Sequence, residues 1–197
     1  MAELGRRVVK LGGSLLECAD LVERWNAWVA RQTPRQTLLV VGGGGLVDVV
    51  GELQQLHPQI TDKDAHWLAV RAMQLNAEMI VGLLSEAEYV VDVEAFANRP
   101  RAAGLFVVDP WGFMQADARG ACPLAATWDV SSDSIAARLA VVVGAEELVL
   151  LKSALPDDAR NPGDFVDAAF AETSRDLKSV RFVNLRDAAF AEACAKK

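Results

Sequence analysis

Two short apolar runs near the start of the chain, each followed directly by glycines, constrain the fold more than any other feature. The residues from Arg7 to Leu11 and from Thr37 to Val41 are continuous enough to be strands that are buried on both faces. Gly12 and Gly13 follow the first run, Gly42 to Gly45 follow the second, and helical spacing of apolar residues begins after each. This repeated order of strand, glycine turn and helix is typical of parallel strands joined by helices.

The rest of the chain continues the alternation of strands and helices. Further strands are predicted over 89–93, 105–108, 147–151 and 181–184, and helices over 15–29, 46–56, 62–84, 131–142 and 188–197. Loops or a hairpin are expected over 109–126, and a loop over 154–164. We therefore expect an α/β fold, a three-layer αβα sandwich with a mostly parallel sheet, in a single domain that covers 1–197.

Composition and charge exclude several classes of partner. The net charge of −7 and the lack of a basic stripe argue against nucleic acid, because phosphate backbones are bound by basic surfaces. No stretch is long and apolar enough for a bilayer, so no membrane partner is expected. Cys18, Cys122 and Cys194 are widely spaced and odd in number, which favours a reducing compartment, with the cytoplasm as the default location.

Two lysines and two glycine clusters are the candidates for chemistry. Lys10 ends the first strand, and Gly12 and Gly13 expose backbone N–H groups where a helix begins, which suits an anion. A tight turn with an exposed lysine is the alternative. The run from Gly42 to Gly45 is costly to order and makes sense where the backbone packs around a ligand, although a flexible turn would also explain it. Lys152 ends the strand over 147–151 and so mirrors Lys10.

A helix start supplies the acidic candidate. Ser131 is a plausible N-cap, and Asp133 lies in the first turn, where its simplest role is to complement the helix dipole. In open α/β sheets, ligands bind at the carboxyl ends of strands. Four features at strand ends or helix starts therefore point together to one anion-binding edge of the sheet.

These four segments, taken in order, resemble the amino-acid-kinase superfamily, which includes carbamate, acetylglutamate, aspartate and uridylate kinases. They are Val8–Ser14, Gly42–Gly45, Asp133–Ala137 and Leu151–Ser153. The resemblance implies a carbamate-kinase-like fold, with an acceptor-binding lobe over 1–127 and a shortened nucleotide-binding lobe over 128–197. It also implies ATP and Mg²⁺ as cofactors, a small anionic substrate and a homodimer or larger homo-oligomer, for which Trp25 and Trp28 are candidate contacts.

The resemblance also implies roles for individual residues. Lys10 would contact the transferring phosphoryl group, Lys152 the nucleotide phosphates, and Asp133 would hydrogen-bond both ammonium groups. No metal ligand from the protein is expected, because Mg²⁺ arrives with the nucleotide. The nucleotide-binding candidates are Ser153 and Asp157, although the loop after Lys152 departs from the family pattern. The phosphate-binding candidates are Gly12, Gly13, Ser14, Gly42, Gly43, Gly44 and Gly45.

The segments Ala65–Met73 and Trp128–Ser134 resemble a smaller subgroup, the kinases of methanofuran and tetrahydromethanopterin one-carbon cofactor biosynthesis. That resemblance implies a phosphate monoester as acceptor, such as an aminomethylfuran-methanol phosphate. His66 and Arg71 are the candidates for binding it, although a surface or capping histidine and a solvated arginine are the simpler interpretations. A carboxylate or carbamate acceptor remains an alternative, as does a protein that binds nucleotide or oxyanions without turnover.

Overall fold

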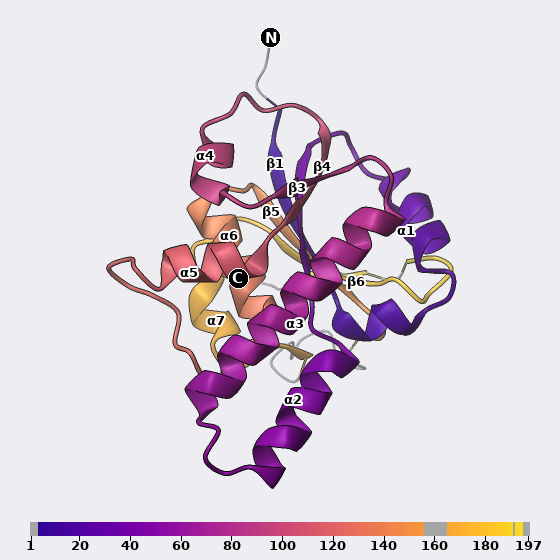
Figure 1. The fold of residues 1–197 in the computed structure, drawn as a ribbon. Helices are drawn as coiled ribbons and strands as arrows, with labels where there is room; N and C mark the ends of the chain where they lie inside the picture. The colour runs from indigo at the N-terminus through magenta and orange to yellow at the C-terminus, as the bar shows by residue number, and fades with distance from the viewer. Residues whose placement is uncertain (1–3, 156–164, 191, 195–197) are drawn as a thin grey trace.

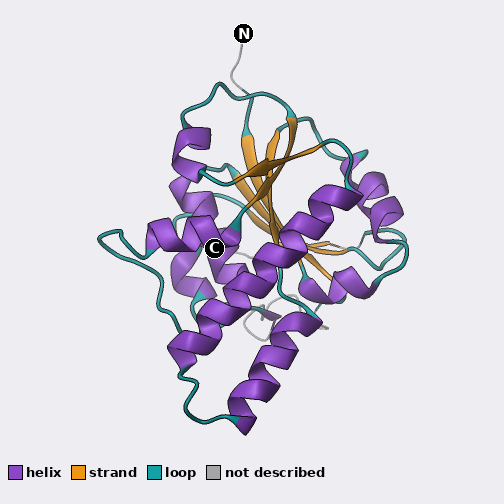
Figure 2. Cartoon of the chain, in the orientation of Figure 1, coloured by secondary structure: helices purple, strands orange, loops and turns teal. Residues whose placement is uncertain are grey.

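The two apolar runs that precede the glycine clusters form neighbouring parallel strands at the centre of a seven-stranded sheet. The computed structural model describes residues 4–155, 165–190 and 192–194 (Figures 1 and 2). The strands lie in the order β3-β4-β2-β1-β5-β6-β7, and only the β6–β7 pair is antiparallel among the described pairs. Their bounds are β1 (Arg6–Leu11), β2 (Gln36–Val41), β3 (Ala87–Val90), β4 (Gly104–Val108), β5 (Glu147–Lys152), β6 (Val180–Asn184) and β7 (Glu192–Cys194).

Helices cover both faces of this sheet, which confirms the predicted three-layer α/β fold. One layer contains α4, α5, α6 and α7; the other contains η1, α1 and the C-terminal half of α3. The helix bounds are η1 (Gly13–Glu17), α1 (Leu21–Val29), α2 (Gly45–Leu56), α3 (Asp62–Leu83), α4 (Val93–Ala97), α5 (Pro110–Asp117), α6 (Ser132–Val142) and α7 (Phe170–Thr173).

The central strands are apolar throughout because successive side chains enter different cores. In β1, Val8 packs in the core that contains α6, whereas Val9 packs against α1 on the other face. In β5, Leu150 packs in the core that contains α6, and Leu151 packs in the core on the other face. A strand with both faces covered has no solvent-facing positions, so its sequence shows no polar alternation.

The long helix α3 connects the two cores and begins at a well-formed cap. The Thr61 hydroxyl accepts a hydrogen bond from the Asp64 backbone N–H at 3.2 Å, and the Asp64 carboxylate accepts one from the Thr61 N–H at 3.1 Å. Along the helix, Met73 packs in one core and Ile80 in the other. In Figure 1, α3 runs diagonally across the front of the molecule with α2 beside its N-terminal half.

Several segments differ from the sequence-based prediction; for example, the strand expected over 89–93 ends at Val90, and Val93 begins helix α4. Residues 110–117 form helix α5 where loops or a hairpin were expected; the Asp109 carboxylate accepts from the Trp111 N–H at 3.0 Å, and Pro110 occupies the first turn. The helix expected over 188–197 is wrong for residues 192–194, which form β7 against β6. Helix propensity was overridden there by the free edge of β6, where unpaired backbone groups accept another strand.

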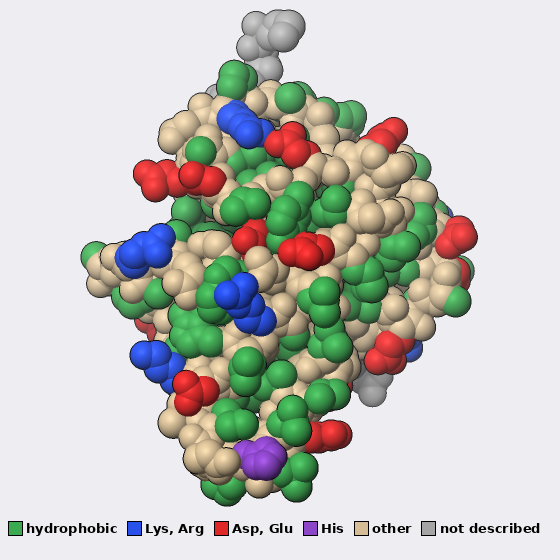
Figure 3. Space-filling view, viewed as in Figure 1, with side chains coloured by type: hydrophobic (Ala, Val, Ile, Leu, Met, Phe, Trp, Pro, Cys, Tyr) green, Lys and Arg blue, Asp and Glu red, His purple; other side chains and the backbone are tan. Residues whose placement is uncertain are grey.

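Helix α2 leaves its apolar side chains at the surface. None of its residues is buried, and Leu46, Val49, Leu53 and Leu56 are between 42% and 73% exposed. Figure 3 shows hydrophobic side chains gathered along the face that α2 and α3 present. Within the described part of the chain, no helix has the length and hydropathy needed to cross a membrane.

The tryptophans of α1 belong to the core rather than to a partner contact. Trp25 and Trp28 are 4% and 1% exposed, so the expectation that one of them faces a partner is wrong. We predict that Trp28→Ala lowers the free energy of unfolding by about 3–5 kcal/mol, because it leaves a large cavity. Trp128→Ala is the control: this side chain is 38% exposed, and its loss should cost less than about 1 kcal/mol. Urea unfolding of both variants measures their free energies of unfolding. An equal loss of stability in the two variants would contradict the prediction.

Candidate active site

Lys10, Asp133 and Lys152 meet at the carboxyl ends of the central strands. The Lys10 ammonium lies 2.9 Å from one carboxylate oxygen of Asp133, and the Lys152 ammonium lies 2.5 Å from the other. The side chains of all three are less than 15% exposed. Sequence reasoning named these residues, and the structure brings them together as a buried lysine–aspartate–lysine cluster.

The register of the sheet explains why both lysines reach one carboxylate. Lys10 is opposite Leu150 in the β1–β5 pair, so Lys10 and Lys152 have the same parity and point to the same face. That face is covered by α6, whose first turn carries Asp133. Ser131 caps this helix as predicted, its hydroxyl accepting from the Asp133 N–H.

Burial and charge together set the protonation of the cluster. Burial alone would raise the pKa of Asp133, but the ammonium groups of Lys10 and Lys152 outweigh it and leave the pKa lowered. Burial, followed by repulsion from Lys10, lowers the pKa of Lys152 to about 8, although Asp133 opposes this shift. With all three groups ionised, the cluster has a net charge of +1 and suits an anionic ligand.

The two glycine turns are packed against each other beside this cluster. A Cβ added to Gly13 would overlap the backbone of Gly44, and one added to Gly42 would lie 2.7 Å from the backbone nitrogen of Gly13. Gly44 also has a positive φ of 54° as the N-cap of α2. Glycine is therefore required here for close approach of two backbones, and the flexible-turn interpretation does not apply to Gly13 and Gly44.

A buried asparagine that sequence reasoning missed holds the second turn. The Asn76 side-chain amide donates hydrogen bonds to the carbonyls of Gly42 at 2.9 Å and Gly43 at 2.8 Å. It lies on the apolar side of α3, close to the buried Met73 and Ile80. A polar residue on an otherwise apolar helix face was the available signal, since buried polar groups are almost always hydrogen-bonded.

A second missed residue, Asp167, fixes the start of α6. Its carboxylate accepts from the backbone N–H groups of Ser131 at 2.9 Å and Ser134 at 3.1 Å, and from both of their hydroxyls. The nearby Phe165 carbonyl accepts from the Lys152 ammonium at 2.8 Å. No motif marks this segment, so only the tertiary structure identifies it.

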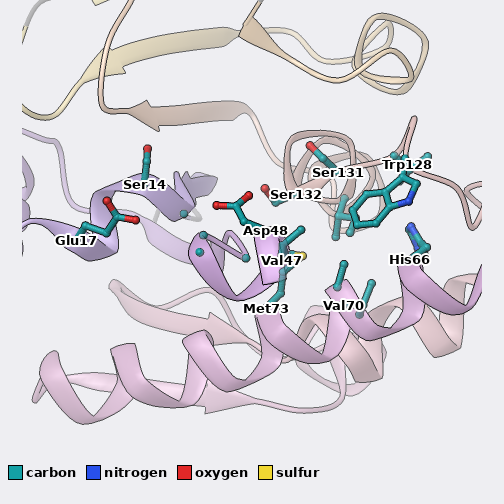
Figure 4. Close-up of a pocket in the computed structure, with 17 residues that line it drawn as sticks. Ser14, Glu17, Val47, Asp48, His66, Val70, Met73, Trp128, Ser131 and Ser132 are labelled. Atoms are coloured by element: carbon teal, nitrogen blue, oxygen red, sulfur yellow. The ribbon is translucent and has the colours of Figure 1, made fainter. Parts of the chain in front are cut away.

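A cavity of about 290 Å³ opens beside the glycine turns (Figure 4). At one end it is bordered by the starts of η1, α2 and α6, where backbone N–H groups make the potential positive. Its other walls are apolar side chains of α3 and α6 together with Trp128. Its charged lining is acidic: Glu17 of η1 and Asp48 of the first turn of α2 line the cavity, and no lysine or arginine is among its described lining residues.

His66 lines this cavity as a neutral group. It is 3% exposed, and its Nδ1 lies 3.0 Å from the Thr127 carbonyl oxygen, so Nδ1 carries the proton and donates it. Burial lowers the pKa of His66, which favours the neutral ring. Its Nε2 is buried without a hydrogen-bond partner among the described residues and therefore offers a lone pair to a ligand. The expectation of a surface or capping histidine is wrong.

The other residues predicted to bind nucleotide, phosphate or acceptor do not all lie at the cavity. The Ser14 hydroxyl donates to the Ser153 hydroxyl at 3.0 Å, which joins the turns after β1 and β5. Arg71 does not line the cavity: its guanidinium lies 3.5 Å from the centre of the Trp111 ring and donates to Gln74. Asp157 lies outside the described residues. Among the residues described, no group of three or more acidic, histidine or cysteine side chains could hold a metal ion.

We predict that Gly13→Ala lowers kcat/KM for phosphoryl transfer by at least about a hundredfold, because the new methyl group forces the two turns apart. Gly51→Ala in α2 is the matched control: a Cβ there meets nothing within 4 Å, and the change should leave the rate unchanged and stabilise the helix slightly. Steady-state kinetics and circular dichroism measure both effects. A Gly13→Ala enzyme with the original rate would contradict the close-packing argument.

Comparisons with known proteins agree with this architecture. A uridylate kinase structure from Archaeoglobus fulgidus is 18% identical, with a TM-score of 0.62 over 96% of this chain and 97% of that one. A UMP kinase from Bacillus anthracis is 14% identical, with a TM-score of 0.64 over 95% and 90% of the two chains. An aspartate kinase from Synechocystis is 14% identical, with a TM-score of 0.60 over 96% of this chain and 40% of that one.

At these identities the structures establish the fold, and the sequence comparison establishes the family. Among curated proteins, none matches this sequence. The sequence pattern of the amino acid kinase family matches residues 5–154, a range that holds Lys10, both glycine turns, Asp133 and Lys152. This chain is therefore a member of the amino acid kinase family.

Proposed function

We propose that this protein is an ATP-dependent kinase that transfers the γ-phosphoryl group to a small phosphate monoester bearing an amino group, of the aminomethylfuran-methanol phosphate type. Family membership supports the phosphotransferase activity. One observation carries the finer proposal: the cavity combines backbone N–H groups of helix starts with the carboxylates of Glu17 and Asp48 and an otherwise apolar wall. A substrate that carries an anionic group, a cationic group and an apolar body matches this lining.

The two lysines and the helix starts suit the phosphates. Phosphoryl transfer depends on alignment and on neutralising the charge of the transferring group. Lys10 and Lys152 supply two cations whose direction is fixed by Asp133, and the N–H groups at the starts of η1 and α2 add fixed dipoles. An acceptor phosphate is already ionised, so it requires no general base.

The close-packed glycine turns favour binding of nucleotide phosphates at the carboxyl ends of the strands. Backbone without side chains lets an anion reach the N–H groups. Lys10 and Lys152 would hold the β- and γ-phosphates of ATP. Mg²⁺ would bind mainly through those phosphates, as it commonly does, and would neutralise part of their charge.

The two carboxylates and the apolar wall suit a cation on a flat apolar body. Glu17 in η1 and Asp48 in the first turn of α2 place two carboxylates at the cavity. The free Nε2 of His66 accepts a hydrogen bond and so favours a donor, such as an ammonium N–H, over another oxyanion. Val70, Met73 and Trp128 supply apolar surface in the same cavity.

The test is an acceptor panel with purified protein, ATP and Mg²⁺. It contains phosphate monoesters with and without an amino group, carboxylates and carbamate. We expect the amine-bearing phosphate to have the highest kcat/KM. Glu17→Gln and Asp48→Asn should each lower kcat/KM for that acceptor by about 1–3 kcal/mol, the value of a charge-assisted contact, while leaving the acceptor without an amine unaffected.

Three results would count against the proposal, each in a different way. Turnover of carboxylates or carbamate alone would assign the protein to the carboxylate-kinase alternative. If Glu17→Gln and Asp48→Asn lowered kcat/KM equally for the phosphate acceptors with and without an amino group, the two carboxylates would not bind an ammonium group. ATP binding without turnover of any acceptor would favour a protein that only binds nucleotide.

The mechanism also predicts a loss of activity at high pH. Lys152 has a pKa lowered to about 8, and the ligand needs its charged form, so deprotonation above that pH removes one cation from the site. We expect kcat/KM to fall as pH rises through about 8. Lys152→Arg should retain its charge and lose this alkaline limb, whatever its absolute rate. An unchanged limb in the arginine variant would exclude Lys152 as the titrating group.

A further inference from the structure

Two adjoining cavities lie at the amino ends of the strands, at the opposite end of the sheet from the lysine–aspartate–lysine cluster. Thr37 and Leu105, near the starts of β2 and β4, line the larger cavity, of about 530 Å³. Glu147 and Arg181, near the starts of β5 and β6, line the smaller cavity, of about 380 Å³. In Figure 1 the chain enters β1 from the N-terminus at the top, and α2, which follows the second glycine turn, lies at the bottom. The residues that line both cavities are Arg7, Trp28, Gln32, Thr33 and Arg35.

The smaller cavity has an excess of positive charge, although the whole protein has a net charge of −7. Its charged lining residues, among those described, are Arg7, Arg31, Arg35, Arg181, Glu147 and Glu192. Four guanidinium groups and two carboxylates leave two positive charges in excess. Glu146, which is outside this lining, pairs with Arg35 at 2.5 Å and reduces the excess to one. The cavity therefore suits an anion with a single charge.

Two of these guanidinium groups have donors left for a ligand. Arg7 is 4% exposed, and within the described part of the chain only its Nε donates, to Glu147 at 2.6 Å. Arg31 has no carboxylate partner among the described residues; it lies 4.5 Å from the centre of the Phe190 ring and donates to the Ala189 carbonyl at 3.4 Å. A guanidinium group offers parallel N–H donors whose spacing matches the two oxygens of a carboxylate.

Trp28 borders both cavities and has an unused donor of its own. It is 1% exposed, and its indole N–H has no hydrogen-bond partner among the described residues. A buried donor without a partner carries a free-energy cost, which an acceptor oxygen of a ligand can remove. The apolar lining of the larger cavity comes from α1, the end of α3 and β4, and includes Val22, Trp25, Val29, Leu84 and Leu105. Such a wall suits a flat apolar body.

We propose that the two cavities together bind a monoanionic carboxylate that carries an aromatic body. The carboxylate lies in the smaller cavity and accepts hydrogen bonds from Arg7 and Arg31, and the aromatic body lies in the larger cavity beside Trp25. A phosphate monoester is a poorer match, because its second negative charge would face Glu147 and Glu192 without a further cation. This ligand is distinct from the substrates of phosphoryl transfer, whose proposed site is at the other end of the sheet.

The aromatic-acid site shares its two central strands with the catalytic cluster. Arg7 and Glu147 are direct partners in the β1–β5 pair, and the same strands carry Lys10 and Lys152 at or near their carboxyl ends. Binding at the amino ends therefore stabilises the strands that hold both lysines, since a ligand of the native state stabilises it. Because the two sites lie at opposite ends of these strands, both can be occupied at once.

The test is a titration followed by ¹H–¹⁵N nuclear magnetic resonance, which resolves the indole N–H signals of the five tryptophans. The probe is naphthoate, with naphthamide as the neutral control and naphthyl phosphate as the dianion; substitution of each tryptophan by phenylalanine assigns the signals. We expect naphthoate to shift the Trp25 and Trp28 signals with a dissociation constant of about 1 mM or lower, and the other two compounds to bind about tenfold more weakly. Trp128 lines the candidate active site and should not shift.

Two variants test the location of the site. Arg31→Gln removes one guanidinium group, and Val29→Glu places a carboxylate at the larger cavity; both side chains are exposed, so the core is left intact. Each should weaken naphthoate binding by about tenfold with unchanged circular dichroism. The matched control is Arg119→Gln, an exposed arginine outside both cavities, which should keep the original affinity.

Three results would overturn the proposed site: no shift of the Trp28 signal at about 10 mM naphthoate, shifts confined to Trp128, or full affinity in both Arg31→Gln and Val29→Glu. Naphthyl phosphate that binds as tightly as naphthoate would overturn the preference for a single negative charge. Naphthamide that binds as tightly would overturn the role of the guanidinium groups.

Discussion

The active site depends on one buried carboxylate, that of Asp133, placed between two ammonium groups. Lys10 and Lys152 lie on adjacent parallel strands and point to the same face, where without a counter-charge they would repel each other in a poorly solvated setting. Asp133 cancels one of the two charges and directs both groups. Removal of one partner from a buried ion pair typically costs about 3–5 kcal/mol, so the cluster also contributes to the stability of the strand ends.

The rest of the site is arranged around this cluster by backbone contacts. Close packing of Gly13 against Gly44 brings the starts of η1 and α2 together, and Asn76 ties the second turn to α3. Asp167 holds the start of α6 in the same manner. The Asn76 amide is buried, so without its two hydrogen bonds it would carry a desolvation cost. The edge of the sheet at the glycine turns is therefore held by close backbone packing and by hydrogen bonds within the protein.

The cavity lining is electrostatically uneven. Backbone N–H groups at the helix starts and the carboxylates of Glu17 and Asp48 lie on one side, whereas the neutral His66 and Trp128 lie on the other (Figure 4). The ammonium groups of Lys10 and Lys152 are held by Asp133 outside the described lining of this cavity. Helix α3 contributes to the cavity with one side and presents exposed apolar side chains on the other.

The sequence by itself determined the fold class through local patterns of apolar strands and glycine turns, and it named Lys10, Asp133 and Lys152 through strand ends, a helix start and the resemblance to a family. The sequence-based prediction was wrong at residues 192–194, where pairing with the edge of β6 outweighed helix propensity. It was also wrong at α5, where the helix start at Asp109 and Pro110 was overlooked. The roles of Asn76 and Asp167, the neutral state of His66 and the position of Arg71 outside the cavity were decided only by the tertiary structure. Those properties depend on contacts between segments far apart in the chain, and no local pattern encodes which of them will meet.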